Sequence, residues 1–218
     1  MEYCSKKVQA GVEKIKAMIP AKARQGEVGE ELRNLHKAIL KSFAGKGRPM
    51  NDQEIEKIVG SGNAGAALRS LQKKDLVVLD ANGKLVGSYP MTMENTVHYV
   101  AINGNFINAM CALDSLGISQ MFDTKVRIES KCHVTHADIV IEQDGERILT
   151  AKPSEDVCIG IVWNSPTECC AHSLCTNMVY LKDGKIAKQW ASECSQREVY
   201  SLKEAVDFSG KIFIPLVK

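Results

Sequence analysis

The chain has 218 residues and a formal net charge of +2 at pH 7. This length allows one large domain, or a small domain beside a medium one, and the near-neutral charge gives no support to a general nucleic-acid-binding protein. The sequence has no apolar run near the ~20 residues that cross a bilayer and no signal-peptide stretch in residues 1–7, so we expect a cytosolic protein without membrane association.

The chain contains eight cysteines, which is many for a cytosolic protein of this size. A disulfide framework is improbable in a reducing compartment, and some of the cysteines are expected to be small buried apolar residues. The sequence contains no Cys-x-x-Cys pair, which argues against a zinc ribbon or finger.

The first half of the chain predicts a series of helices followed by a hairpin. Apolar residues recur at helical spacing in residues 6–19 and 27–43, and Asn51 with Glu54 forms the signature of a capping box. A second short helix follows from Ala64 to Leu71. The Asn-Gly pair in the turn 80–83 predicts a hairpin between strands 76–79 and 84–87.

This order of helix, two short helices and hairpin is typical of a winged helix-turn-helix, which we assign to a module of residues 1–95. The second short helix offers Asn63, Arg69, Lys73 and Lys74 for contact with DNA. The set is sparse, so a helical module used for packing is the favoured interpretation and a DNA role is not expected.

Residues 96–218 predict an α+β core with a mostly antiparallel sheet. Strands are expected at 97–102, 125–130 and 158–163, and a hairpin joins 138–142 to 147–149 across Asp144-Gly145.

A predicted helix over residues 105–116 carries the first candidate site residues. Cys111 and Asp114 are three residues apart, so on a helix they share a face and a proton can pass between them. A thiol and a carboxyl group that meet a second thiol would suit chemistry on a soft metal.

The vicinal pair Cys169-Cys170 is the candidate for the second thiol. Ser165, Pro166 and Glu168 form a good helix start, which places Cys169 in or near the first turn. The helix dipole there favours a thiolate, although Glu168 opposes it. The plainer interpretation is one buried and one incidental cysteine.

Other cysteines and histidines have simpler interpretations. Cys132 lies in a segment with His133 and His136 that would still need a fourth ligand to bind a metal, so a structural Cys132 is favoured. Cys158 is expected in the core and His172 in an ordinary helical position. The sequence offers no compelling partner for three further cysteines, Cys4, Cys175 and Cys194.

Cys111-Ala112-Leu113-Asp114, Cys132 and Cys169-Cys170, in this order after a winged-helix-like module, resemble the organomercurial (alkylmercury) lyase family. The resemblance spans about residues 28–195. It implies protonolytic cleavage of the carbon–mercury bond of R–Hg⁺ to R–H and Hg²⁺, an activity that detoxifies organic mercury. It also implies a helical N-terminal part and an unusual antiparallel sheet.

Carried over by position, the family's mercury-binding cysteines fall on Cys111 and Cys169, its catalytic aspartate on Asp114 and its structural cysteine on Cys132, with Cys170 auxiliary at most. Asp114 would also lie near the product Hg²⁺ on the two sulfurs. Met110 stands where well-known members carry tryptophan, and the expected late aromatics are missing. These departures bear on the range of substrates, alkyl or aryl, more than on the type of reaction.

The resemblance implies that no cofactor is required and that Hg²⁺ is a bound product. The implied partners are organomercurial–thiol adducts, low-molecular-weight thiols and a mercuric reductase. Two rival functions remain open at this point. The first is a non-catalytic binder of soft metals, which would have no need of Asp114. The second is a metal-responsive winged-helix regulator, which the near-neutral charge disfavours.

Overall fold

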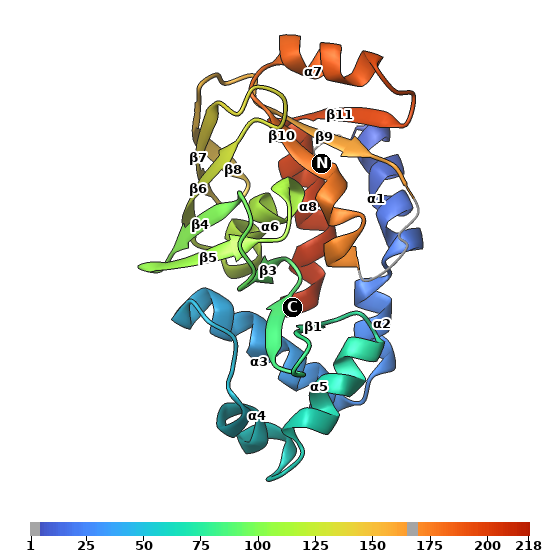
Figure 1. The fold of residues 1–218 in the computed structure, drawn as a ribbon, viewed down its shortest axis with the longest axis vertical. Coiled ribbons are helices and arrows are strands. Elements are labelled where there is room, and N and C mark those ends of the chain that lie inside the picture. The colour runs from blue at the N-terminus through green and yellow to red at the C-terminus, as the bar shows by residue number, and fades with distance from the viewer. Residues whose placement is uncertain (1–4, 165–169) are drawn as a thin grey trace.

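The computed structural model describes residues 5–164 and 170–218, and it shows an α+β protein whose helices and sheets share one hydrophobic core (Figure 1). This core extends from Val8 near the N-terminus to Leu216 near the C-terminus. The predicted fold class is therefore confirmed. No helix in the described part of the chain combines the length and apolar character needed to span a membrane.

Five helices precede the first strand and lie along one side and the lower end of the molecule in Figure 1. They are α1 (Lys6–Met18), α2 (Ala21–Glu27), α3 (Glu30–Lys46), α4 (Asp52–Val59) and α5 (Ala64–Lys73). The predicted capping box is present, because Asn51 accepts a hydrogen bond from the Glu54 amide and Glu54 accepts one from the Asn51 amide. The two short helices and the hairpin follow in the predicted order, whereas α2 is an additional helix that the sequence pattern did not predict. The winged-helix interpretation stays a prediction.

The larger sheet is antiparallel at every pairing and has the strand order β1-β2-β3-β5-β4-β6-β7-β8. Its strands are β1 (Val78–Leu79), β2 (Leu85–Ser88), β3 (Met91–Thr92), β4 (Tyr99–Ile102), β5 (Asn105–Ala109), β6 (Lys125–Lys131), β7 (Asp138–Asp144) and β8 (Arg147–Lys152). The short strand β3 pairs with both β2 and β5. The hairpin of the N-terminal module therefore continues directly into the sheet of the core.

The helix predicted over residues 105–116 is wrong in its first half. Residues 105–109 form strand β5, and the helix α6 extends from Ala112 to Phe122. Asn103 and Gly104 both have positive φ angles and make a tight turn after β4, so the following residues fold back and pair with β4. Ile107 and Ala109 then alternate inward with the period of a strand.

A smaller sheet and the C-terminal helices complete the fold. The sheet has the order β10-β9-β11, with β9 (Cys158–Val162), β10 (Met178–Leu181) and β11 (Arg197–Ser201), and all its pairings are antiparallel. The 3₁₀ turns η1 (Cys170–His172) and η2 (Cys175–Asn177) precede β10, and α7 (Gly184–Ser192) and α8 (Leu202–Val217) follow it. Helix α7 covers β11 at the top of the molecule in Figure 1.

Helix α6 lies at the centre of the molecule (Figure 1), and every residue from Ala112 to Met121 is buried. A helix that is apolar on all sides is expected in the core of a protein. It packs most extensively against α8 and also touches β5, β6, β7 and β10. Any side chain at the start of α6 is therefore shielded from solvent.

Candidate active site

Cys111 occupies the N-cap position of α6, with an extended backbone and a fully buried side chain. Its Sγ accepts a hydrogen bond from the Asp114 amide at 3.3 Å. Cysteine here takes the capping role that serine or aspartate usually fills. The sulfur consequently lies at the positive end of a helix, where negative charge is stabilised.

Asp114 lies in the first turn of the same helix and is 3% exposed. The spacing of Cys111 and Asp114 predicts that their side chains share a face, and in the structure they do lie together, although Cys111 is the N-cap that precedes the helix. The ligand atoms of Cys111, Asp114 and a third residue all lie within 4.8 Å of one another.

That third residue is Cys175, for which the sequence offered no partner. It begins the turn η2, is 5% exposed, and its Sγ donates a hydrogen bond to Asp114 Oδ2 at 3.6 Å. The interpretation of Cys175 as a residue without a compelling partner is therefore wrong. No local pattern marks Cys175, which lies three residues before strand β10 and reaches Asp114 through the tertiary fold, because β10 pairs with β9 and contacts α6.

The predicted second thiol, Cys169, lies outside the described residues, as does the predicted helix start at 165–168. Cys170 begins the turn η1, and its side chain is outside the description as well. The roles assigned to Cys169 and Cys170 therefore stay predictions. Among the described residues, Cys111, Asp114 and Cys175 are the group whose side chains are placed to hold a metal ion together.

Burial controls the charge state of this site. Removal from water raises the pKa of the Asp114 carboxyl to about 7, although the thiol groups that donate hydrogen bonds to it act in the opposite direction. Burial likewise raises the pKa of the Cys111 thiol to about 11. Near neutral pH the site therefore holds thiol protons beside a carboxyl group that is poised to accept or return one.

The surroundings of the site are mostly apolar. A small cavity of about 30 Å³ adjoins Asp114 and Cys175. The residues that line it come from both ends of the chain and from its middle, and they are Ile15, Ile19, Ala21, Tyr89, Leu113, Asp114, Cys175, Met178, Ile212 and Phe213. Behind the site, Ser115 and Tyr180 share a buried hydrogen bond of 2.8 Å.

Cys132 is fully buried at the end of β6, where its amide donates to Ala137 and its carbonyl accepts from His136. Burial raises the pKa of its thiol, but hydrogen bonds from Thr135 and from neighbouring backbone groups outweigh this and lower the pKa. The sulfur thus accepts hydrogen bonds within a tight turn. Within the described ranges, His133 and His136 form no ligand group with it, and the structural role of Cys132 stays a prediction.

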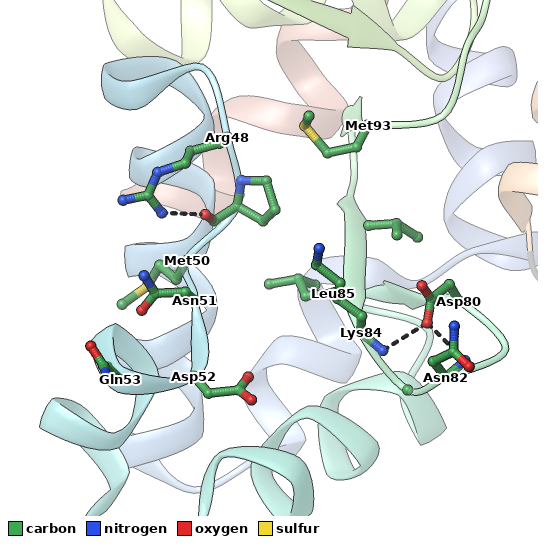
Figure 2. A pocket seen from close by; sticks show the side chains of 13 residues that line it. Arg48, Met50, Asn51, Asp52, Gln53, Asp80, Asn82, Lys84, Leu85 and Met93 are labelled. Atoms are coloured by element: carbon green, nitrogen blue, oxygen red, sulfur yellow. Dashed lines mark hydrogen bonds between the residues drawn. The ribbon is translucent and has the colours of Figure 1, made fainter.

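A larger groove of about 990 Å³ lies between the start of α4 and the β1–β2 hairpin (Figure 2). Arg48, Met50 and Asn51 face it from one side, and Lys84 and Met93 from the other. Acidic residues also line it, and no cysteine of the described chain does. The groove is therefore separate from the thiol site.

Comparisons with known proteins identify the family of the chain. A family model described as alkylmercury lyase matches residues 91–214, more than half of the chain. The alkylmercury lyase of Bacillus cereus is 24% identical over 196 residues, which cover 90% of this chain and 88% of that protein. The alkylmercury lyase of Staphylococcus epidermidis is 26% identical over 173 residues, covering 79% and 78%.

The fold is also similar to a crystal structure of the mercury-bound form of MerB2, with a TM-score of 0.76. That similarity covers 94% of this chain and 99% of the other at 19% sequence identity. The chain therefore belongs to the alkylmercury lyase family of enzymes.

Proposed function

We propose that this enzyme cleaves the carbon–mercury bond of R–Hg⁺ by protonolysis, with Cys111 and Cys175 as the two thiolate ligands and Asp114 as the acid. The observation that carries the proposal is the buried group itself, two sulfur atoms and a carboxylate within 4.8 Å of one another. Mercury is a soft metal, and thiolate is the ligand type that suits soft metals best.

The reaction begins with exchange of thiols on mercury. Cys111 displaces R′S⁻ from the substrate R–Hg–SR′, and its proton passes through Asp114 to the departing thiolate, which leaves as R′SH. Cys175 then adds to mercury and gives its proton to Asp114. The two thiolates donate electron density to mercury, which makes the bound carbon more basic.

Asp114 completes the reaction by giving a proton to that carbon, so that R–H leaves and Hg²⁺ remains on the two sulfur atoms. Two thiol protons enter the sequence, and they leave in R–H and R′SH. The pKa of about 7 supports this role, because a carboxyl near neutrality both accepts and returns protons. Every group in this sequence belongs to the chain or the substrate.

The substrate and the product imply the partners. Organomercurials meet abundant thiols in a cytosol and would arrive as thiol adducts. The product Hg²⁺ on two buried thiolates would leave by ligand exchange with low-molecular-weight thiols or with the thiols of a mercuric reductase. The cavity beside Asp114 and Cys175 is small and apolar, which favours a small alkyl group as R.

The rival functions are a soft-metal binder without catalysis and a metal-responsive regulator. The buried carboxyl group beside the two thiols favours the enzyme, because a protein that only binds a soft metal needs no proton donor next to its ligands. The DNA-binding alternative draws no support from the charges of the chain, which nearly cancel.

The test is to incubate reduced protein with methylmercury and excess thiol and to follow methane by gas chromatography. We expect turnover by the wild type and none by Cys111→Ser, while Cys194→Ser, a variant of a cysteine away from the cluster, keeps the wild-type rate. Tight mercury binding without methane would contradict the proposal and favour the binder.

A further inference from the structure

A thioether lies next to the thiol of Cys111. Met178 is the first residue of β10 and is 4% exposed. Its Sδ is 3.7 Å from Cys111 Sγ, within contact distance of the thiol. Among the described side chains, three sulfur atoms therefore lie at the site, on Cys111, Cys175 and Met178.

The position of Met178 is fixed by the backbone. Met178 pairs with Ile161 in the central strand β9 of the smaller sheet, and Cys175 lies three residues earlier on the same segment. Both side chains line the small cavity beside Asp114. Met110, although adjacent to Cys111 in sequence, lies against Gly87 instead, since a Cβ added at Gly87 would be 2.8 Å from its Cε.

Thioether sulfur is a soft donor, like thiolate, but it carries no proton. It can give a lone pair to mercury without releasing H⁺ into the site. A methionine ligand therefore adds electron density at the metal and leaves the proton balance between the thiols and Asp114 unchanged.

We propose that Met178 is a third sulfur ligand of mercury, one that binds R–Hg⁺ on Cys111 and then holds the product Hg²⁺ between the two cysteines. The inference rests on the proposed function of Cys111 and Cys175. Coordination by Met178 forms one dative S–Hg bond, breaks no covalent bond and needs no oxidant or reductant. The consequence is slower loss of the product to competing thiols.

The first test uses the wild-type enzyme labelled with ¹³C at the methyl groups of its eight methionines. On addition of one equivalent of Hg²⁺, we expect the Met178 methyl resonance, assigned from its loss in Met178→Leu, to shift more than any other. Met121, buried in α6 about two turns beyond Asp114, should hardly move. A Met178 resonance that stays in place would overturn the inference.

The second test measures release of bound Hg²⁺ to excess dithiothreitol. Met178→Leu preserves an apolar side chain of similar size, so we expect release about tenfold faster than in wild type. Met121→Leu is the matched control and should release Hg²⁺ at the wild-type rate. Equal release rates in all three proteins would show that Met178 only fills space.

The wild-type measurement does not depend on how well any variant folds. X-ray absorption at the mercury edge of the wild-type Hg²⁺ complex should show three sulfur neighbours, and two alone would contradict the inference.

The Cys111→Ser variant distinguishes failure of the proposed function from failure of the third ligand. If that variant still binds Hg²⁺ as tightly and releases methane, the proposed function itself fails. If it loses both while the Met178 tests are negative, only the third ligand is disproved.

Discussion

The buried carboxyl group of Asp114 lowers the stability of the folded protein at neutral and higher pH, and the same burial makes it able to donate a proton. Its folded pKa of about 7 is higher than its ordinary value of 3.8, because burial disfavours the charged form. Between these two pH values the folded protein holds a proton that the unfolded chain has lost. Stability is therefore lost as the pH rises through this window, and above it the folded protein must bury a charged carboxylate.

Replacing Asp114 by asparagine should accordingly separate the two effects. We expect Asp114→Asn to slow protonolysis by roughly 10²–10⁴-fold, because the amide cannot act as the acid, while Hg²⁺ still binds the two cysteines. At pH 8 the variant should be more stable than wild type by on the order of 2–4 kcal/mol in urea unfolding. Asp123→Asn, an exposed cap at the other end of α6, is the control. Normal methane release from Asp114→Asn would remove the residue from the acid role.

At the scale of elements, the site depends on the contact between α6 and α8. Gly117 in α6 faces Phe213 in α8 so closely that a Cβ at Gly117 would lie 2.5 Å from the Phe213 ring. Phe213 in turn lines the cavity beside Asp114. The absence of a side chain at Gly117 therefore sets how near α8 comes to the site.

The substitution Gly117→Ala should force these helices apart. We expect it to destabilise the protein by about 1–3 kcal/mol through overpacking, and to lower turnover as the cavity wall shifts. Gly45→Ala in α3 is the matched control, because nothing lies within 4 Å of a Cβ there and alanine favours a helix by up to ~1 kcal/mol. Denaturant midpoints measure both changes, and equal midpoints would contradict the close contact.

Local sequence patterns predicted the elements whose signals are short-range. The capping box at Asn51 and Glu54 is one example, and the Asn-Gly turn between β1 and β2 is another. The helix predicted over 105–116 failed because an apolar run does not reveal where a strand ends and a helix begins. The turn at Asn103-Gly104 was the deciding signal.

The position of Cys175 could not be read from local pattern. Cys111 and Cys175 are 64 residues apart in the sequence, and they meet because β10 pairs with β9 and β10 also contacts α6. Such pairing is a property of the tertiary fold. The resemblance to a known family implied the reaction, the pair Cys111 and Asp114, and Cys169 as the second thiol, which lies outside the described residues. The proximity of Cys175 to this pair appeared only in the structure.

At the scale of the whole molecule, both ends of the chain enclose the site. Helix α1 packs against α8, where Gly11 leaves room for Tyr200 and Phe208. Further along, buried Gln25 in α2 donates to the Leu216 carbonyl and to His36 Nδ1. His36 Nε2 in turn contacts Ser88 Oγ at 3.1 Å. One buried histidine thus joins α2, α3, α8 and the sheet.

This arrangement should make the protein sensitive to acid. Burial lowers the pKa of His36 to about 4 from an ordinary 6.5, so in that window the unfolded chain binds a proton that the folded protein does not. Protonation of His36 in the unfolded chain costs no folding stability above pH 6.5, and this cost grows as the pH drops toward 4. At pH 5 we expect a loss on the order of 2 kcal/mol from this group. Urea unfolding of His36→Asn should show a shallower pH dependence than that of exposed His133→Asn, and equal slopes would contradict this assignment.

We propose Cys175, in place of Cys169, as the second mercury-binding thiolate. The most direct measurement is methane release from methylmercury by Cys175→Ser and Cys169→Ser, compared in one experiment under excess thiol. Cys175 Sγ donates a hydrogen bond to Asp114 Oδ2, so we expect background release from Cys175→Ser and turnover near the wild-type rate from Cys169→Ser. Near-normal release from Cys175→Ser, with loss in Cys169→Ser, would contradict it.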